Sequence, residues 1–271
     1  MASAAGLVPD DILRCIPGCE DGRPPRAVQP LPGGRGCNQV LRVDTGEGHF
    51  VLRRRYAPVD RPGSRAADEL RAQRLAAAAG LAPTVLAAHA QGQWMLMEFI
   101  AAPVWTRDRL HSDAGVEALG RQLARLHGLA VPADWPAVDP VAMADDYLAR
   151  LGAFDAAQAA DMALFRERIA ALSRRLSGIG VPLVLNHGDL MASNLLGEAP
   201  LLVDWEYAQV ADPGWDLACL LTYYPDMSRF LPGLLATSGL AGTTRVVLEM
   251  QLERFALLNR LWERLAVHEG G

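Results

Sequence analysis

The stretch from Leu183 to Leu220 places more polar residues between apolar runs than any other part of this 271-residue chain. The apolar run that ends at Leu185 leads into a loop. Leu195–Leu196 and Leu201–Val203 then have the pattern of two short strands around a turn. We therefore expect a compact arrangement of short strands whose loops carry the polar residues.

Polar residues stand in these loops at a defined spacing. His187, Asp189 and Asn194 form the pattern H-x-D-x-x-x-x-N, and Asp204 follows ten residues later at the end of an apolar run. Phosphoryl transfer needs a carboxylate that orients a hydroxyl, and oxygen ligands that hold Mg²⁺ against the nucleotide phosphates. The spacing predicts a site with Asp189 as the base and with Asn194 and Asp204 as magnesium ligands. We expect His187 to brace the catalytic loop.

The composition excludes several other kinds of site. All 26 basic residues are arginine, so the chain has no lysine for a Walker-type phosphate loop, a Schiff base or a lysine general base. The net charge of -5, with one short basic cluster at Arg53–Arg55, argues against a nucleic-acid partner. The cysteines form no C-x-x-C pair, so neither a zinc site nor a disulfide framework is indicated.

The N-terminal segment MASAAGLVPDDIL has no basic region and no long apolar run. No stretch of 18 uncharged apolar residues occurs in the sequence. We therefore expect no signal peptide, no contact with a membrane and a cytoplasmic location, as a monomer or homodimer.

A glycine-containing turn precedes a β-hairpin in the N-terminal part. Residues 31–38 read LPGGRGCN, and residues 40–53 have the pattern of two strands joined by a turn. The backbone amides of Gly33 and Gly34, with Asn38 at the exit of the loop, are suited to approach the phosphates of ATP. An ordinary hairpin turn is the alternative.

A helix is predicted from Ser64 to Ala79, because this segment is rich in good helix formers and Gly80 follows it. If the helix packs on the hairpin, Glu69 turns toward the second strand. Arg53 on that strand would then pair with Glu69 and touch the phosphates, in the position that a lysine takes elsewhere. The alternative is that the two residues are separate solvated charges.

Two more predicted strands, Thr84–Ala88 and Trp94–Phe99, complete a small antiparallel sheet. A connector to the second half of the chain follows. Its backbone from Glu98 to Ile100 is the place where we expect the adenine ring to be contacted. The remainder is predicted to be mainly helical, with helices over Ser112–His127, Met143–Leu151, Met162–Leu176 and Thr243–Val267.

Three motifs carry a family resemblance. They are Asn186-His-Gly-Asp-Leu190 with Asn194, Asp204-Trp-Glu-Tyr207, and Ala211-Asp-Pro-Gly-Trp-Asp-Leu-Ala218. Together they resemble the aminoglycoside phosphotransferase and choline kinase superfamily, most closely its choline and ethanolamine kinase branch. The resemblance implies an α+β, bilobal protein-kinase-like fold. Residues 1–100 would form a small nucleotide-binding N-lobe, an antiparallel sheet with one helix, and residues 101–271 a larger, mainly helical C-lobe for catalysis and acceptor binding.

The resemblance also implies roles for single residues. Asp189 is the catalytic base, Asn194 and Asp204 bind magnesium, Glu206 assists a second magnesium, and Asp216 braces the catalytic loop. The cofactors are then ATP and Mg²⁺, and the partner is a small hydroxylated acceptor. A protein kinase is disfavoured, because no A-P-E motif follows Asp204.

The choice of acceptor rests on aromatic residues. A quaternary ammonium group is bound by aromatic faces near negative charge, and the sequence suggests the side chains Trp205, Tyr207, Trp215 and Trp262. Core packing is the alternative role for each of them. We expect transfer of the ATP γ-phosphate to a choline- or ethanolamine-like amino alcohol.

Three alternatives remain open at this point. Thiamine, a cation with a primary alcohol, fits the aromatic residues nearly as well as choline. An aminoglycoside or amino sugar calls for a broad acidic surface, for which the sequence offers scattered aspartates. A catalytically silent kinase-fold protein that only binds nucleotide is the alternative from another class, and intact Asp189 and Asn194 count against it.

Overall fold

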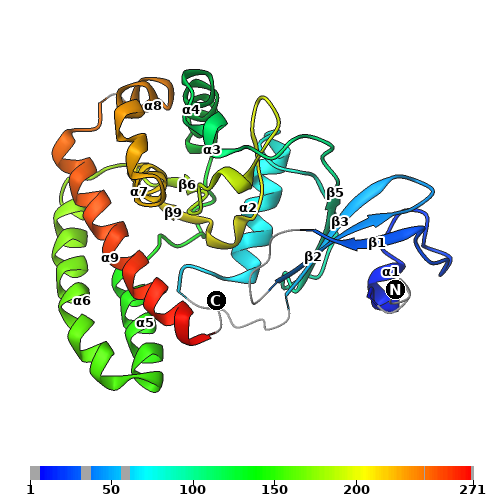
Figure 1. Ribbon diagram of the computed structural model, residues 1–271, viewed down its shortest axis with the longest axis horizontal. Helices are drawn as coiled ribbons and strands as arrows, with labels where there is room; N and C mark the ends of the chain where they lie inside the picture. The colour runs from blue at the N-terminus through cyan, green and yellow to red at the C-terminus, as the bar shows by residue number, and fades with distance from the viewer. Residues whose placement is uncertain (1–6, 32–37, 56–61, 241, 270–271) are drawn as a thin grey trace.

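A five-stranded antiparallel sheet forms the N-terminal part of the protein, and helices form most of the remainder (Figure 1). The computed structural model describes residues 7–31, 38–55, 62–240 and 242–269. The strands lie in the order β1-β2-β3-β5-β4. Their bounds are Ala27–Pro30 for β1, Asn38–Asp44 for β2, His49–Arg55 for β3, Val85–Ala88 for β4 and Trp94–Glu98 for β5.

The predicted hairpin is present as β2 and β3, which pair in an antiparallel register along their whole length. Alternation along the two strands turns Leu41 and Leu52 to one face, where both are fully buried. This face packs against Ile12 and Ile16, in and just after the short helix α1 (Asp10–Leu13). The sheet therefore has a small hydrophobic core of its own.

Strand β1 was not predicted from the sequence. It lies at the edge of the sheet and, within the described residues, pairs only with β2. Its last residue, Pro30, lacks a backbone N–H, which an edge strand tolerates because one of its sides needs no ladder hydrogen bonds.

Helix α2 (Ala66–Ala78) lies between the sheet and the helical part (Figure 1). Its fully buried residues Ala72 and Ala76 belong to the same hydrophobic cluster as the C-terminal helices, whereas the sheet forms a separate cluster. Gly80, with φ of 66°, follows the end of the helix as the sequence predicts. Helix α2 therefore joins the two parts of the molecule.

The helical part is built around α5, α6 and α9, which run side by side (Figure 1). Side-chain oxygens of Ser112, Asp139 and Asp155 accept backbone N–H groups at the starts of α4, α5 and α6. The helices are α3 (Arg107–Leu110), α4 (Asp113–His127), α5 (Pro140–Phe154), α6 (Ala156–Ser177), α7 (Gly214–Tyr223), α8 (Leu231–Thr237) and α9 (Arg245–Glu269). In the part of the chain that the structure describes, no helix combines the length and the apolar composition needed to cross a lipid bilayer.

Two short strand pairs lie between α6 and α7 in sequence, and the loops that carry Asp189 and Asp204 follow strands β6 and β8. β6 (Val184–Asn186) pairs with β9 (Gln209–Ala211), and β7 (Leu195–Leu196) pairs with β8 (Leu201–Leu202). The 3-10 helices η2 (Ala192–Asn194) and η3 (Trp205–Tyr207) follow β6 and β8, and η4 (Pro225–Phe230) follows α7. The α+β arrangement, with a small antiparallel sheet and a larger helical part, confirms the expected fold class.

Candidate active site

The loop after β6 is braced from inside the protein. His187 is fully buried, and its ring accepts the Asp189 backbone N–H at Nδ1, at 3.3 Å. The Nε2 atom therefore carries the proton and donates to the Val203 carbonyl at 3.0 Å. Burial lowers the pKa of His187, which keeps the ring neutral. The ring thus links the Asp189 backbone to the segment before Asp204 from inside the protein.

Asp216, at the start of α7, holds the same loop from its other side. Its fully buried carboxylate accepts the backbone N–H of His187 at 3.2 Å and of Gly188 at 2.9 Å. His127, at the end of α4, places its Nε2 atom 3.1 Å from the same carboxylate. This contact was not predicted, because a histidine at a helix end is usually a packing residue.

Gly188 is required by the close approach of two chain segments. Its φ is 77°, and a Cβ atom at this position would lie 2.2 Å from the Tyr207 carbonyl oxygen. Any larger residue would push the loop away from η3. The loop that carries Asp189 and the segment that carries Asp204 and Glu206 are thereby held together.

Asp189 and Asn194 form a hydrogen-bonded pair in this loop. The Asn194 amide Nδ2 donates to the Asp189 Oδ2 atom at 2.8 Å and to the Asp189 carbonyl at 2.9 Å. Burial and the charge of Asp204 raise the pKa of Asp189 to about 7, although the hydrogen bond from Asn194 favours the ionised form. The carboxylate is thus fixed in orientation and is suited to accept a proton near neutral pH.

Asp204 and Glu206 face the sheet across the junction of the two parts. Asp204 has φ of 66°, in the left-handed region, and its carboxylate is 29% exposed. The Glu206 carboxylate is 23% exposed. Burial and the charge of Asp204 raise the pKa of Glu206, against the lowering effect of Arg53. The two side chains come from η3 and the residue before it, so they share one edge of the site.

Arg53 on β3 makes the predicted ion pair with Glu69 on α2. Its Nη2 atom also lies 2.8 Å from Asp204 Oδ1 and 3.1 Å from Glu206 Oε2. Arg55, two residues further along the strand, donates from Nη2 to Glu69 Oε2 at 2.5 Å. The sequence did not predict this second partner, because the register that brings two arginines to one glutamate depends on how α2 packs.

Asn38 reaches the site from the first residue of β2. Its Nδ2 atom donates to Glu206 Oε2 at 2.7 Å. The neighbouring Gly33 and Gly34, expected to approach phosphates, lie in residues 32–37, outside the described residues.

The donor set fits a magnesium ion that binds together with a nucleotide. Asp204, Glu206 and the Asn194 amide offer oxygen atoms, and Mg²⁺ in such sites takes one or two carboxylates, with phosphate and water oxygens completing the shell. No group of three or more His, Cys, Asp and Glu side chains in the described ranges is arranged to hold a metal ion by itself. The residues present therefore fit a shared site, not an all-protein cage.

The Glu98 carboxylate, at the end of β5, is engaged within the protein. Glu98 Oε1 accepts the Thr84 backbone N–H at 2.9 Å, and its own backbone N–H donates to the Thr84 carbonyl. Further along, Val104 pairs with Leu196 of β7. Glu98 and Ile100 are both half-buried at this junction. An adenine contact would have to use the backbone here, because the Glu98 carboxylate is engaged.

Aromatic side chains gather around Asp189. Burial raises the pKa values of Tyr207 and Tyr223, and the charge of Asp189 and the nearby Tyr147 phenol act in the same direction on both. The Trp262 indole on α9 acts on Tyr207 in the opposite direction, as a hydrogen-bond donor. Trp262 is 39% exposed. Tyr147, on α5, had no signal in the sequence.

Trp205 and Trp215 differ from the acceptor-binding expectation. They are 1% and 2% exposed. The Trp205 ring packs edge-on against His187, and its Nε1 atom donates to the Leu202 carbonyl. The Trp215 ring packs against Phe255. Neither indole has a free face for a ligand, so both serve the core.

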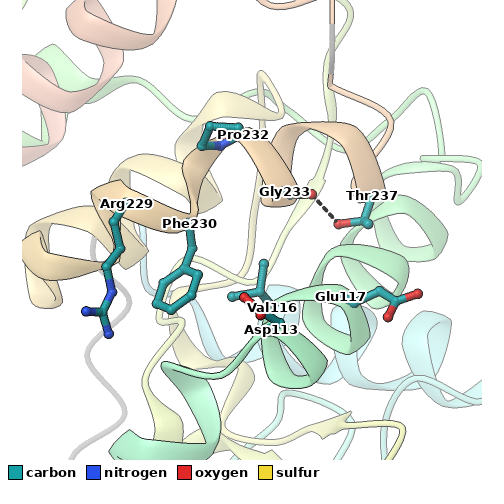
Figure 2. A pocket seen from close by; sticks show the side chains of 8 residues that line it. All are labelled: Asp113, Val116, Glu117, Arg229, Phe230, Pro232, Gly233 and Thr237. Atoms are coloured by element: carbon teal, nitrogen blue, oxygen red, sulfur yellow. Dashed lines mark hydrogen bonds between the residues drawn. The ribbon is translucent and has the colours of Figure 1, made fainter.

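A separate hollow of about 350 Å³ lies between α4 and α8 (Figure 2). Figure 2 shows Phe230 and Val116 facing it from the two sides, with the Thr237 hydroxyl turned back to the Gly233 carbonyl. Its lining residues, Asp113, Val116, Glu117, Arg229, Phe230, Pro232, Gly233 and Thr237, include none of the candidate site.

Comparison with known proteins identifies the family of the chain. The model of the phosphotransferase enzyme family matches residues 27–249. No curated protein matches the chain in sequence.

Solved structures show the same fold. A choline/ethanolamine kinase family protein from Mesorhizobium loti is 25% identical, with a TM-score of 0.71 over 97% of this chain and 86% of that chain. A choline kinase from Streptococcus pneumoniae is 18% identical, with a TM-score of 0.72 over 90% and 86% of the two chains. A spectinomycin phosphotransferase, solved with ADP and spectinomycin, is 16% identical, with a TM-score of 0.63 over 89% and 83%. These likenesses confirm the expected kinase-like fold and the predicted superfamily.

Proposed function

The chain belongs to the phosphotransferase enzyme family, and from this premise we propose an ATP- and magnesium-dependent kinase that phosphorylates the hydroxyl group of a choline- or ethanolamine-like amino alcohol. The observation that carries the proposal is the Asp189 carboxylate, oriented by Asn194 at 2.8 Å and raised in pKa to about 7 beside Asp204. A nucleotide-binding protein without catalysis would have no need for this arrangement.

The residues divide the work as follows. Asp189 accepts or orients the proton of the acceptor hydroxyl. Asn194 and Asp204 would hold magnesium, with Glu206 beside them, and the ion when bound neutralises the charge of the transferred phosphoryl group. His187 and Asp216 keep the loop in position, because their hydrogen bonds fix the backbone at residues 187–189.

We assign nucleotide binding to residues 1–100 and acceptor binding to residues 101–271. Arg53 on the sheet, held by Glu69, is the cation we assign to the phosphates, and Asn38 lies beside it. Gly33 and Gly34 keep their proposed role as amide donors, and the backbone between Glu98 and Ile100 its proposed role toward adenine. We propose a cytoplasmic location, because the proposed reaction consumes ATP, and we keep a monomer or homodimer as the expected state.

The aromatic environment of Asp189 supports a cationic acceptor. Tyr207 and Tyr223 lie near the charge of Asp189, and Trp262 and Tyr147 interact with Tyr207. Aromatic faces and a nearby negative charge are what a quaternary ammonium group binds. Trp205 and Trp215 are left out of this proposal because both rings are buried.

A coupled ADP-release screen with Mg²⁺ tests the proposal. The panel contains choline, ethanolamine, thiamine, amino sugars and aminoglycosides, and we expect the highest kcat/KM for choline or ethanolamine. Preference for thiamine or for an amino sugar would replace the acceptor but keep the reaction. Folded protein that binds ATP and phosphorylates none of these alcohols would overturn the proposal in favour of a silent nucleotide-binding protein.

A further inference from the structure

Arg53 connects three carboxylates that come from both parts of the molecule. Its side chain is 6% exposed, and it pairs with Glu69 of α2 while its Nη2 atom contacts Asp204 and Glu206 of the helical part. A guanidinium group presents donors in a planar fork, so it can serve partners on two sides at once. A lysine ammonium at this position would be a single point of charge.

Asn38 adds a second contact between the same two parts. Its amide donates to Glu206 Oε2, the atom that Arg53 also contacts. Two donors from neighbouring strands of the sheet thus converge on one carboxylate oxygen of η3. The sheet and the helical part are tied together at the carboxylates that we assign to magnesium.

The Arg53 guanidinium at these carboxylates opposes the binding of a metal cation to them. Asp204 and Glu206 lie within 3.1 Å of Arg53 Nη2. A divalent ion bound to the same oxygens would stand a few ångströms from the guanidinium, and like charges at that distance repel strongly in a partly buried site. The ion and Arg53 therefore compete for the two carboxylates.

We propose that Arg53, assisted by Asn38, acts as a latch that links the sheet to the helical part in the nucleotide-free protein. Arg53 must leave Asp204 and Glu206 before a metal ion binds to these carboxylates. The inference rests on the proposed function, since it takes these carboxylates as metal ligands. When the latch opens, Arg53 keeps Glu69 as a partner and turns its Nη2 edge to the nucleotide phosphates. The metal and the nucleotide open the latch together, because one takes the carboxylates and the other takes the arginine.

Metal binding to the nucleotide-free protein is the direct test, with Mn²⁺ as a paramagnetic probe for the magnesium position. In Arg53→Met, Glu69 keeps Arg55 as a partner, so the core of the junction remains paired. We expect Arg53→Met to bind Mn²⁺ at least about tenfold more tightly than the parent protein, which corresponds to about 1.4 kcal/mol. Binding of metal-free ADP should weaken in the same variant, because the phosphates lose their cation.

Arg55→Met is the matched control. It removes a neighbouring cation of the same type from Glu69 but leaves Arg53 on the two carboxylates, so we expect a clearly smaller gain in Mn²⁺ affinity. Asn38→Ala is a second variant that keeps Arg53 in place, and it should give a gain between the other two. Circular dichroism and thermal unfolding check that each variant is folded.

The outcomes separate the latch from the proposed function. Equal or weaker Mn²⁺ binding by folded Arg53→Met, or by Asn38→Ala if Arg53→Met is unfolded, would overturn the latch. Tighter Mn²⁺ binding in a protein that phosphorylates no alcohol would keep the latch and overturn the kinase. If the parent protein phosphorylated choline but the variants bound Mn²⁺ no more tightly than the parent, the kinase would stand and the latch would be overturned.

Discussion

Asp189 is held by two hydrogen bonds from a single amide, and this fixes what its substitution should do. Asp189→Asn keeps the shape of the side chain and removes the carboxylate that we propose as the proton acceptor. We expect kcat to fall by about 10²- to 10⁴-fold, the usual contribution of a positioned base, while ATP affinity stays within about twofold. Initial-rate kinetics on the best acceptor and calorimetric titration with ATP measure the two quantities.

If Asp189→Asn lowered kcat by less than about tenfold, another group would have to accept the proton. Asn194→Ala provides a comparison, because it should lower kcat and also weaken the apparent affinity for Mg²⁺. The two variants therefore differ in the metal dependence of the rate, not only in its size.

Gly188 gives a prediction about stability. Gly188→Ala combines a positive φ with a Cβ atom 2.2 Å from the Tyr207 carbonyl, whereas Gly180→Ala has φ of 71° and open space around the new atom. The positive φ alone should cost either alanine variant about 1 to 2 kcal/mol. We expect Gly188→Ala to lower the free energy of unfolding by at least about 2 kcal/mol more than Gly180→Ala. Urea denaturation of the two variants measures the difference, and equal losses would contradict the close approach described for this loop.

The sequence pattern indicated which polar residues lie together, but it did not indicate which aromatic residues are buried. The spacing of Asp189, Asn194 and Asp204 follows from short strands around tight loops, and that geometry is local. Whether Trp205 or Tyr207 faces the site depends on how η3 rotates against the core, which is a tertiary property. His127 and Tyr147 lie far away in sequence and carry no local signal.

Helix α4 illustrates what a single cap contributes to an element. The Ser112 hydroxyl accepts the Gly115 backbone N–H at 3.1 Å and donates to the Arg109 carbonyl at 2.8 Å. Ser112→Ala should lower the free energy of unfolding by about 1 kcal/mol. The kcat should not change, because the far end of α4, where His127 meets Asp216, keeps its contacts.

Ser228→Ala, at an exposed serine of η4, serves as the control for the loss of a hydroxyl. Chemical denaturation and initial rates at saturating substrate test both variants. A loss of kcat in Ser112→Ala would mean that the two ends of α4 are coupled.

The elements with strong local patterns were predicted within a few residues. Examples are the β2–β3 hairpin, α2 with Gly80 behind it, and α4 with its serine cap. Strand β1 was not, because its residues have no alternating pattern and the strand forms only where β2 offers a free edge. The sequence before it is rich in turn formers, which hides a short edge strand.

In the molecule as a whole, the packing of α2 couples the unfolding of the sheet to that of the helical part. Its buried alanines belong to the core of the helical part, although in sequence the helix lies between strands β3 and β4 of the sheet. Small side chains allow a close approach here, and pulling α2 away would expose both sides of that contact. The contact of Arg53 with Asp204 depends on this packing, so no sequence pattern could predict it.

We therefore expect the protein to unfold in one cooperative transition, with equal calorimetric and van't Hoff enthalpies. ATP with Mg²⁺ should raise the midpoint of that single transition, since we propose that the ligand contacts both parts. Differential scanning calorimetry with and without nucleotide measures this. Two resolved transitions, or a shift of only one of them, would mean that the sheet unfolds independently.

Asp204 is, among the described residues, the one other than glycine with a positive φ. Asparagine and aspartate tolerate this left-handed conformation better than other side chains with a Cβ atom. Two requirements therefore limit which residues can occupy position 204: the positive φ of the backbone and the carboxylate of the side chain. Most substitutions would violate both at once, because they would strain the turn and also remove the carboxylate. Asn is the replacement that separates the two effects, so a loss of metal binding in Asp204→Asn reports on charge, whereas the same loss in Asp204→Ala or Asp204→Val reports on charge and backbone combined.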